Sequence, residues 1–410
     1  MAILDTITSI ENNLTNAYDV CQEKGATIPA KKNLANLADA INSIDGKGST
    51  GIYGVAIDIT NSNPETSVIY TDDAVGMTGG SQDWDNTPIF KNIKPCVLKN
   101  GEVQYYLNPN DYTKKEDGTS ADITSGNDGD VMIEIPKLYY QINTFGNLLT
   151  VKVTDKPNNE GFHSYAHTRD EEGDRNKLYI GVYEGFVDSN NKLRSLSDKM
   201  PTGNKSLATF RGIAHSNGEG YDCMSYHPLV LLQCLYLIRY KNLNSQEALG
   251  YGYANASGAE NTGKSNTNGM YYGTTAGTDH VKFVGIEDLY GGIKNALIDG
   301  VGFSSSGQLC TAFTNFNDAL TGYDKTQFSS GTITGHIKST SGTTETGFFP
   351  RTVGGSTTTY YCDIINVYSG RQLYYGGRWA GKLDIGIFHM SYTVNNGESA
   401  DGWGARLMYL

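Results

Sequence analysis

Residues 228–240 read PLVLLQCLYLIRY, which is apolar on nearly every face of a helix. A helix of that kind has to be buried on most of its sides. Pro228 suits the first turn of a helix, and Asn242 and Asn244 suit its exit. The stretch therefore predicts one central helix around which the other elements of the fold must pack.

Most of the chain after residue 52 has the pattern of short strands. Apolar and aromatic runs are bounded by Gly, Asn and Asp, which is typical of strands joined by turns. We expect strands at 55–59, 104–107, 131–135, 148–153 and 178–183, with a further series in the C-terminal third. A second helix is a candidate at 286–298, although Gly291 and Gly292 weaken it. We expect polar loops at 113–130 and 250–279, and a loop as long as the second is usually functional.

Two apolar stripes at helical spacing open the chain and are separated by Gly25 and Pro29. Each stripe covers little more than two heptads, which is too short for a lone helix. Two alternatives stay open: the helices pack on their own chain, or they join copies of the chain in a stalk. Residues 45–51 suit a flexible hinge. The stripes are formed by Leu4, Ile7, Ile10, Leu14, Ala17 and Cys21, and by Leu34, Leu37, Ile41 and Ile44.

The composition excludes several classes of protein. The 410 residues include 32 Lys and Arg against 44 Asp and Glu, for a net charge of −12. This balance argues against non-specific nucleic-acid binding, which needs basic patches. No run of about 18 apolar residues is present, so we expect no membrane span. The first residues, MAILDTITSIENN, lack the basic and apolar regions of a secretory signal.

The six cysteines are scattered without CxxC spacing, and we expect reduced thiols. They are Cys21, Cys96, Cys223, Cys234, Cys310 and Cys362. His163 and His167 have a spacing that binds metal on a helix. Their flanks read as loop and strand, so a solvated acidic loop accounts better for the His and the carboxylates that follow. A calcium ion on clustered Asp and Asn oxygens stays open.

Motifs for catalysis or nucleotide binding do not occur. The chain has no GxxxxGK[ST], no GxGxxG between a strand and a helix, and no GxSxG. Paired carboxylates such as Asp170 with Glu171, or Glu398 with Asp401, could in principle cleave sugars, but nothing in the sequence marks one of them as buried.

Residues 371–410 carry the richest signal for binding. Tyr and Trp give a large contact area at low entropic cost, and Asn, Ser and Gly add adaptable hydrogen bonds. The same residue types suit sugars, because rings stack on pyranose faces and amides bond hydroxyl groups. The alternative is that half of these residues are ordinary core or turn residues. The predicted ligand-binding residues are Tyr374, Tyr375, Arg378, Trp379, Lys382, Asp384, His389, Tyr392, Asn395, Asn396, Glu398, Asp401 and Trp403.

Several segments resemble the C-type-lectin-like domains in tail proteins of phages that infect Gram-positive bacteria. They are MSYHPLVLLQCLYLIRYKNLNSQEALGYGY (224–253), GDVMIEIPKLYYQ (129–141) and YIGVYEG (179–185). Residues 283–301, FVGIEDLYGGIKNALIDGV, resemble a motif of the formylglycine-generating-enzyme branch of that fold. The ending GGRWAGKLDIGIFHM…GWGARLMYL (376–410) resembles the end of that branch and of variable proteins diversified by retroelements. Residues 17–44 are similar to a segment that often opens tail-tip and fibre proteins.

The resemblance implies an α+β fold in three parts. A helical oligomerisation or docking stalk is expected at 1–45, and a β-rich connecting region at 46–125. A C-type-lectin-like receptor-binding head with short antiparallel strands and one or two buried helices is expected at 126–410.

The resemblance also implies a function, which is non-catalytic receptor binding by a phage tail or a tail-like particle. The expected partners are a bacterial surface glycan or protein, other tail proteins and further copies in a homotrimer, with neither nucleic acid nor membrane insertion. The expected location is the virion tail, assembled in the bacterial cytoplasm and acting outside the cell.

The chain departs from the family motifs at several positions, so the oxidase activity and the calcium-dependent sugar binding of related proteins are not expected here. Cys310 and Cys362 lie far apart, whereas the oxidase branch uses two neighbouring cysteines near its end. The EPN, QPD and WND triplets of calcium-dependent lectins are missing. We expect no cofactor, with calcium left open. The alternatives are a structural tail or baseplate protein and, less favoured, a wall-degrading or oxidase-like enzyme.

Overall fold

The computed structural model describes residues 2–23, 28–33, 36–37, 50–157, 160–169, 173–328, 333–379 and 384–410. Two compact units are present, Met1–Gly51 and Ile52–Leu410, and we call the second unit the head. The sequence suggested a further boundary between residues 125 and 126. Strands from both sides of that position pair in the same sheets, so the head continues across it.

The first unit contains helix α1 (Ala2–Glu23). Tyr18 is fully buried, and its hydroxyl donates to the main-chain oxygen of Asn33 at 2.8 Å. Ile7 and Ile10, by contrast, are about half exposed. The first predicted stripe therefore forms a helix as expected, and part of its apolar surface is open. The second stripe lies outside the described residues except for Leu37.

A seven-stranded antiparallel sheet forms one layer of the head, with strand order β12-β24-β9-β6-β3-β4-β5. Strand β24, from the end of the chain, lies between β12 and β9. The strands are β12 (Tyr221–Cys223), β24 (Leu407–Tyr409), β9 (Lys177–Gly181), β6 (Asp130–Pro136), β3 (Lys94–Lys99), β4 (Glu102–Asn108) and β5 (Asp111–Lys115).

A nine-stranded sheet forms the second layer, with the order β17-β16-β15-β21-β22-β20-β18-β19 and β23 beside β15. The pairs β20–β22 and β15–β23 are parallel, and the others are antiparallel. The strands are β15 (Asn295–Phe303), β16 (Gln308–Thr311), β17 (Asp324–Gln327), β18 (Ile333–Thr340), β19 (Pro350–Val353), β20 (Ile364–Val367), β21 (Arg371–Tyr375), β22 (Met390–Val394) and β23 (Trp403–Gly404).

A four-stranded antiparallel sheet and two short hairpins complete the β structure, so the head is mostly β with few helices. The sheet has the order β2-β1-β8-β7. Its strands are β1 (Ile52–Asp58), β2 (Val68–Asp72), β7 (Tyr139–Phe145) and β8 (Leu148–Thr154), and the hairpins are β10 (Phe186–Val187) with β11 (Leu193–Arg194) and β13 (Lys282–Phe283) with β14 (Ile286–Glu287).

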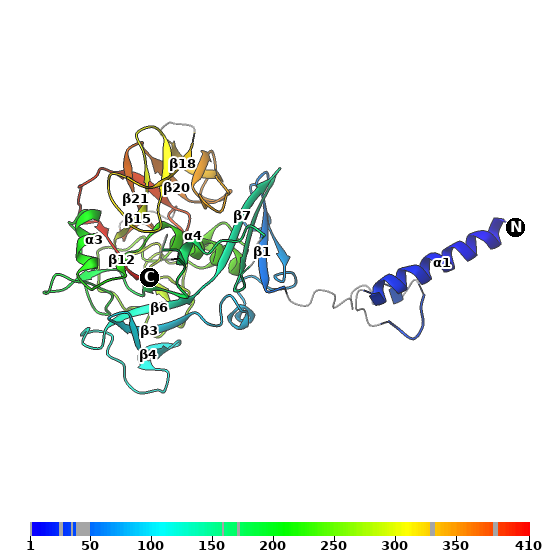
Figure 1. The fold of residues 1–410 in the computed structure, drawn as a ribbon, viewed down its shortest axis with the longest axis horizontal. Helices are drawn as coiled ribbons and strands as arrows, with labels where there is room; N and C mark the ends of the chain where they lie inside the picture. Colours follow the sequence, from blue (N-terminus) through cyan, green and yellow to red (C-terminus); the bar gives the residue numbers. More distant parts are fainter. Residues whose placement is uncertain are drawn as a thin grey trace. The chain divides into compact units, whose positions relative to one another are not determined.

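Helix α4 (Tyr226–Tyr240) lies among the three sheets and contacts β1, β8 and β15 (Figure 1). Every residue from Tyr226 to Arg239 is buried. The central helix predicted from the apolar run is therefore confirmed, starting two residues earlier. The other helices are α3 (Leu207–His215), α5 (Ser245–Ala248) and the 3-10 turns η1 (Gln82–Asn86) and η2 (Tyr165–His167).

The helix predicted at 286–298 is wrong. Those residues form β14, a glycine turn and the beginning of β15. Gly291 has a positive φ of 57°, a conformation that a helix interior does not contain. The apolar residues in this stretch are buried by contacts with distant segments, and their spacing only imitated a helix.

Two further expectations concern the cysteines and the membrane. All six cysteines are free and buried, as expected for reduced thiols. No helix in the described part of the chain combines the length and the apolar character needed to cross a bilayer.

Candidate functional site

The predicted C-terminal residues divide into exposed and buried groups. Tyr374, Arg378, Trp379, Asp384 and Trp403 are partly exposed. Asn395, Asn396, Glu398 and Asp401 are exposed, Tyr375, His389 and Tyr392 are buried, and Lys382 lies outside the described residues.

The three buried residues belong to the core, so their prediction as ligand contacts is wrong. The Tyr375 hydroxyl donates to the main-chain oxygen of Ile387 at 2.8 Å. The Tyr392 ring packs edge-on against Phe349, with centroids 5.6 Å apart. His389 Nδ1 lies 2.7 Å from the main-chain oxygen of Ile364, and burial lowers the pKa of this imidazole to about 4. Side chains of adjacent strand residues point to opposite faces, so the predicted residues could not all face outward.

Two of the partly exposed rings form a pair. Tyr374, on β21, stacks on Trp403, on β23, with centroids 6.2 Å apart and ring planes 27° apart. Both rings pack with one side on the core formed by residues such as Leu297 and Val394. The pair is therefore held rigidly while part of its surface reaches solvent.

Charged side chains lie at the turn that precedes Trp403. A Cβ atom at Gly402 would lie 2.9 Å from Nη1 of Arg378, so the missing side chain lets the guanidinium lie against this turn. Exposed Asp401 accepts an ion pair from buried Lys294 at 3.2 Å. Sequence reasoning missed Lys294, because this residue directly precedes β15 and is distant in sequence from Asp401. We call Tyr374, Arg378, Trp379, Asp401 and Trp403 the ring face.

Trp379 adjoins the long polar loop predicted at 250–279. Its main-chain oxygen accepts a hydrogen bond from the Ala256 amide at 3.1 Å. Within the described residues, Trp379 is a member of neither hydrophobic core cluster, whereas Trp403 packs on one of them. Trp379 is therefore the aromatic side chain of the ring face that the core uses least.

The turn after β22 holds the exposed amides. The Asn395 amide donates to Glu398 Oε2 at 2.8 Å, and the side chain of Asn396 donates to the main-chain oxygen of Asp318 at 2.7 Å. Asn396 also lines a pocket of about 250 Å³ between α3, β15 and β21.

This pocket is lined by charged and amide groups, and we call it the polar pocket. Arg211 donates to both oxygens of Asp299, at 2.7 and 3.0 Å, and to Asp318 at 2.9 Å. Burial raises the pKa of Asp299 to about 6, although Arg211 opposes the shift. Among the described residues no group bonds the buried Oε1 of Gln372, which also lines the pocket. A ligand hydroxyl is one group that would satisfy this acceptor.

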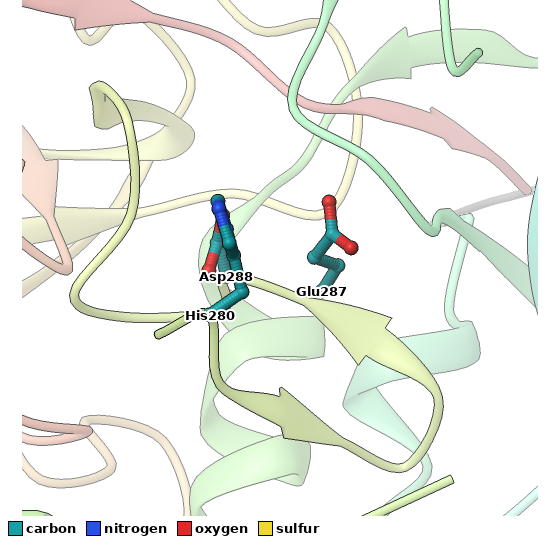
Figure 2. A group of neighbouring side chains, drawn as sticks. All are labelled: His280, Glu287 and Asp288. Carbon is teal, nitrogen blue, oxygen red and sulfur yellow. The ribbon is translucent and has the colours of Figure 1, made fainter. Parts of the chain in front are cut away.

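A second cluster of charged residues is buried in the head (Figure 2). His280, Glu287 and Asp288 project from the ends of the β13–β14 hairpin. His280 Nδ1 lies 2.6 Å from Asp288 Oδ2, and Nε2 lies 2.9 Å from Glu260 Oε1. Burial opposes the charged imidazolium, but Asp288 and the other carboxylates outweigh it and raise the pKa of His280 to about 10. Both ring nitrogens lie at hydrogen-bond distance from carboxylates, and this arrangement favours the imidazolium form at neutral pH.

Most of the donor atoms that a metal ion would need in this cluster already take part in hydrogen bonds. Glu287 accepts hydrogen bonds from the amides of Gly263 and Ser265, at 2.6 and 2.8 Å, and from the Ser265 hydroxyl at 2.6 Å. Within the described residues, only Asp288 Oδ1 is a buried oxygen of the three side chains without a partner. A cation would have to displace the His280 proton and these bonds, so the donor set fits a structural network better than a metal site.

Arg406 and Glu184 tie the cluster to other segments. Arg406 donates to the main-chain oxygens of Gly181, Val182, Glu287 and Asp288 at 2.8–2.9 Å. The carboxylate of Glu184 accepts the amides of residues 293 and 294 at 2.7 and 2.9 Å. Three of the segments that carried the resemblance, 179–185, 283–301 and 376–410, therefore meet in this buried network.

His163 and His167 do not come together as ligands. His163 pairs in a bridge with Tyr140, whereas His167 is buried and its Nε2 lies 3.4 Å from the main-chain oxygen of Ile135. Burial lowers the pKa of His167 to about 4. The acidic residues 170–172 that follow lie outside the described residues.

Comparisons with known proteins give only a distant likeness. No family model and no curated protein matches the chain. The chain is similar to solved structures of the M1, P3c and U1 variants of Major Tropism Determinant, with sequence identities of 11%, 12% and 10% and TM-scores of 0.29, 0.26 and 0.27. The matches cover 77%, 78% and 83% of this chain and 78%, 81% and 91% of those chains. TM-scores this low do not establish a shared function. The function proposed below therefore rests on the residues of this chain.

Proposed function

We propose that this chain is a non-catalytic receptor-binding protein of a phage tail or tail-like particle, and that its head binds a bacterial surface glycan through the ring face. The lectin-like character of the head and its place in the virion tail are parts of the same proposal.

The stacked pair Tyr374–Trp403 is the observation that carries the proposal. The two rings are fixed on one side by the core and partly exposed on the other. A rigid aromatic surface loses little entropy on binding, and it presents a flat apolar face to a sugar ring. Arg378 and Asp401 beside it supply a donor and an acceptor for hydroxyl groups.

The polar pocket adds a second contact region on the same C-terminal segment. Asn396 at its edge comes from the turn that follows β22, and Gln372 lies two residues before Tyr374 on β21. The unpaired oxygen of Gln372 favours a ligand that donates hydrogen bonds. A sugar residue that reaches this pocket would gain an orientation that stacking alone does not provide.

We expect the affinity to come from several heads acting together. Helix α1 leaves Ile7 and Ile10 about half exposed, and a second copy of the helix is the occupant that suits a short apolar stripe. A homotrimer that presents three heads raises the effective concentration for the second and third binding events. A shallow site on each head is then sufficient for firm adhesion.

The proposal is tested by adhesion of the full chain to a panel of Gram-positive cells and to purified wall glycans. The proposed contacts are ring stacking and hydrogen bonds to uncharged hydroxyl groups, and the chain has a net charge of −12. Binding should therefore change little between low and moderate salt. Saturable adhesion that is lost in Trp379→Ala and kept in Tyr368→Ala supports the proposal. Tyr368 is a suitable control because this residue is 43% exposed and lies outside the ring face.

Two outcomes would favour the alternatives. Soluble wall fragments that appear with the wild type and disappear on changing one carboxylate would identify an enzyme. No adhesion to any cell or glycan, together with incorporation into the particle, would identify a structural tail or baseplate protein.

A further inference from the structure

A tyrosine-lined cleft of about 750 Å³ lies on the seven-stranded sheet of the head, and it shares no lining residue with the polar pocket. Tyr221, Tyr409 and Tyr179 line it from the adjacent strands β12, β24 and β9. Tyr409 is directly opposite Tyr221 on one side and Tyr179 on the other. The three residues therefore form a row across the sheet.

The rings of this row contact one another, and the outer two, Tyr221 and Tyr179, are buried at 4% and 7% exposure. The centroids of Tyr221 and Tyr409 are 4.8 Å apart with planes 57° apart, and those of Tyr179 and Tyr409 are 5.9 Å apart with planes 55° apart. Rings tilted by this angle cover less of each other's faces than rings in a parallel stack do. Tyr409 stays partly exposed at the centre of the row.

The row is held in place before any ligand arrives. The Tyr179 hydroxyl donates to buried Glu134 at 2.9 Å, and the Tyr221 hydroxyl accepts the Gly101 amide at 3.2 Å. Gly101 and Gly220 have φ angles of 79° and 83°, and a Cβ atom at either glycine would collide with the Tyr409 ring. These two turns therefore fix the Tyr409 ring, and a fixed ring loses less entropy on binding.

The rim of the cleft identifies the class of ligand. Asn100, Asn176, Arg175 and Glu219 are exposed there. Leu410 is the one aliphatic residue among those that line it, within the described part of the chain. A lipid or an apolar peptide would find little apolar surface at this rim. Two guanidinium groups, one ammonium group and one carboxylate line the cleft together with the amides, from Arg169, Arg175, Lys177 and Glu219. Such groups around aromatic rings bond hydroxyls and stack on sugar rings.

We propose that this cleft is a second saccharide site of the head, separate from the ring face. It takes a short stretch of pyranose residues, with one ring against Tyr409 and its hydroxyl groups bonded by the rim. The inference does not depend on the ring face, because the two sites are built from different strands and different residues.

The test uses saturation-transfer NMR of the full chain with three probes: maltotetraose, chitotetraose and tetragalacturonate. The neutral, acetamido and acidic probes distinguish the kinds of pyranose. We expect transfer to at least one probe, at least tenfold weaker binding in Tyr409→Ala and several-fold weaker binding in Asn176→Ala. Asn176 is exposed, so its variant folds even where loss of the Tyr409 ring weakens the sheet.

The control variant is Tyr368→Ala, which should bind the probe as the wild type does, because Tyr368 is exposed and lies outside both sites. No transfer to any of the three probes would overturn the proposal, as would transfer that both Tyr409→Ala and Asn176→Ala leave unchanged. Transfer that Trp379→Ala abolishes and that Tyr409→Ala and Asn176→Ala leave unchanged would place the probe at the ring face instead. Cell adhesion of the same variants separates the two sites. If the ring face does not bind cells, Trp379→Ala adheres as the wild type does, and this result does not depend on what the cleft binds.

Discussion

The Arg406 guanidinium donates from Nη2 to the main-chain oxygen of Asp288 at 2.9 Å, across 118 positions of sequence. The same side chain bonds three further main-chain oxygens and is 2% exposed. Carboxylates of Glu184, Glu287 and Asp288 interact electrostatically with this buried cation. The fold of the head therefore depends on one arginine that joins segments distant in sequence.

Replacing this arginine should destabilise the head strongly. Arg406→Met removes the cation and leaves buried carbonyl and carboxylate groups without their partner. Breaking a buried charge network in this way costs about 3–5 kcal/mol. Urea unfolding of the full chain measures the change, and Arg351→Met is the matched control because Arg351 is exposed. A loss below about 1 kcal/mol for Arg406→Met would contradict the role of the network.

The stabilisation by His280 should depend on pH. Its pKa in the folded head is about 10, above the value of 6.5 for a free imidazole. The folded state binds the extra proton, so the stabilisation is fully present below about pH 6.5 and is lost as pH rises through 10. The difference in unfolding free energy between the wild type and His280→Gln should therefore narrow from pH 6 to pH 10. A gap that stays constant over this interval would show that His280 carries no charge in the fold.

The two exposed tryptophans should separate binding from stability. Trp379→Ala should reduce adhesion several-fold with little change in melting temperature, because Trp379 belongs to neither core cluster of the described residues. Trp403→Ala should reduce both, because the Trp403 ring packs on the core beneath it. Adhesion and thermal unfolding are measured on the same preparations. A large loss of melting temperature in Trp379→Ala would place that ring in the core.

A matched pair of buried tyrosines tests which predicted residues belong to the core. Tyr375→Phe removes the hydroxyl that donates to Ile387 at 2.8 Å and should cost about 1 kcal/mol. Tyr392→Phe removes a buried hydroxyl that has no partner among the described residues, and should be neutral or slightly stabilising. Chemical unfolding compares the two variants. Neither change should affect adhesion. Weaker adhesion in either variant would show that the tyrosine contacts the ligand.

Removing the first unit should change the number of copies without unfolding the head. The chain divides at Gly51 into two compact units, so a fragment that starts at Ile52 should keep its own core. Light scattering should report a smaller assembly for this fragment than for the full chain, and thermal unfolding should report a similar midpoint. An unchanged number of copies would show that α1 does not hold the copies together.

Local sequence patterns predicted the elements that are buried on every side. The run at 228–240 is apolar on all sides, and only a central helix satisfies it. The stretch at 286–298 has apolar residues at helical spacing, yet it does not form a helix. A glycine turn and the Glu184 carboxylate, which accepts the amides of residues 293 and 294, stabilise an extended conformation instead. That carboxylate is distant in sequence, so no local pattern contained it.

The candidate site was predicted by composition, and composition does not tell inside from outside. Tyr374 and Tyr375 are neighbours on β21, and one is partly exposed while the other is buried. The alternation of a strand could have separated them, because successive side chains point to opposite faces. The polar pocket and the tyrosine row could not be found in this way, since their residues come from strands that meet only in the folded head.

The bond between Arg406 and Val182 spans 224 positions, and contacts of such length make folding slow. Helix α1 depends on neighbours a few residues away and forms in microseconds. Copies that associated firmly at once would bring unfinished heads together while their strand edges are still unpaired, which promotes aggregation. A first unit that associates only weakly by itself would let each head finish folding before the copies join.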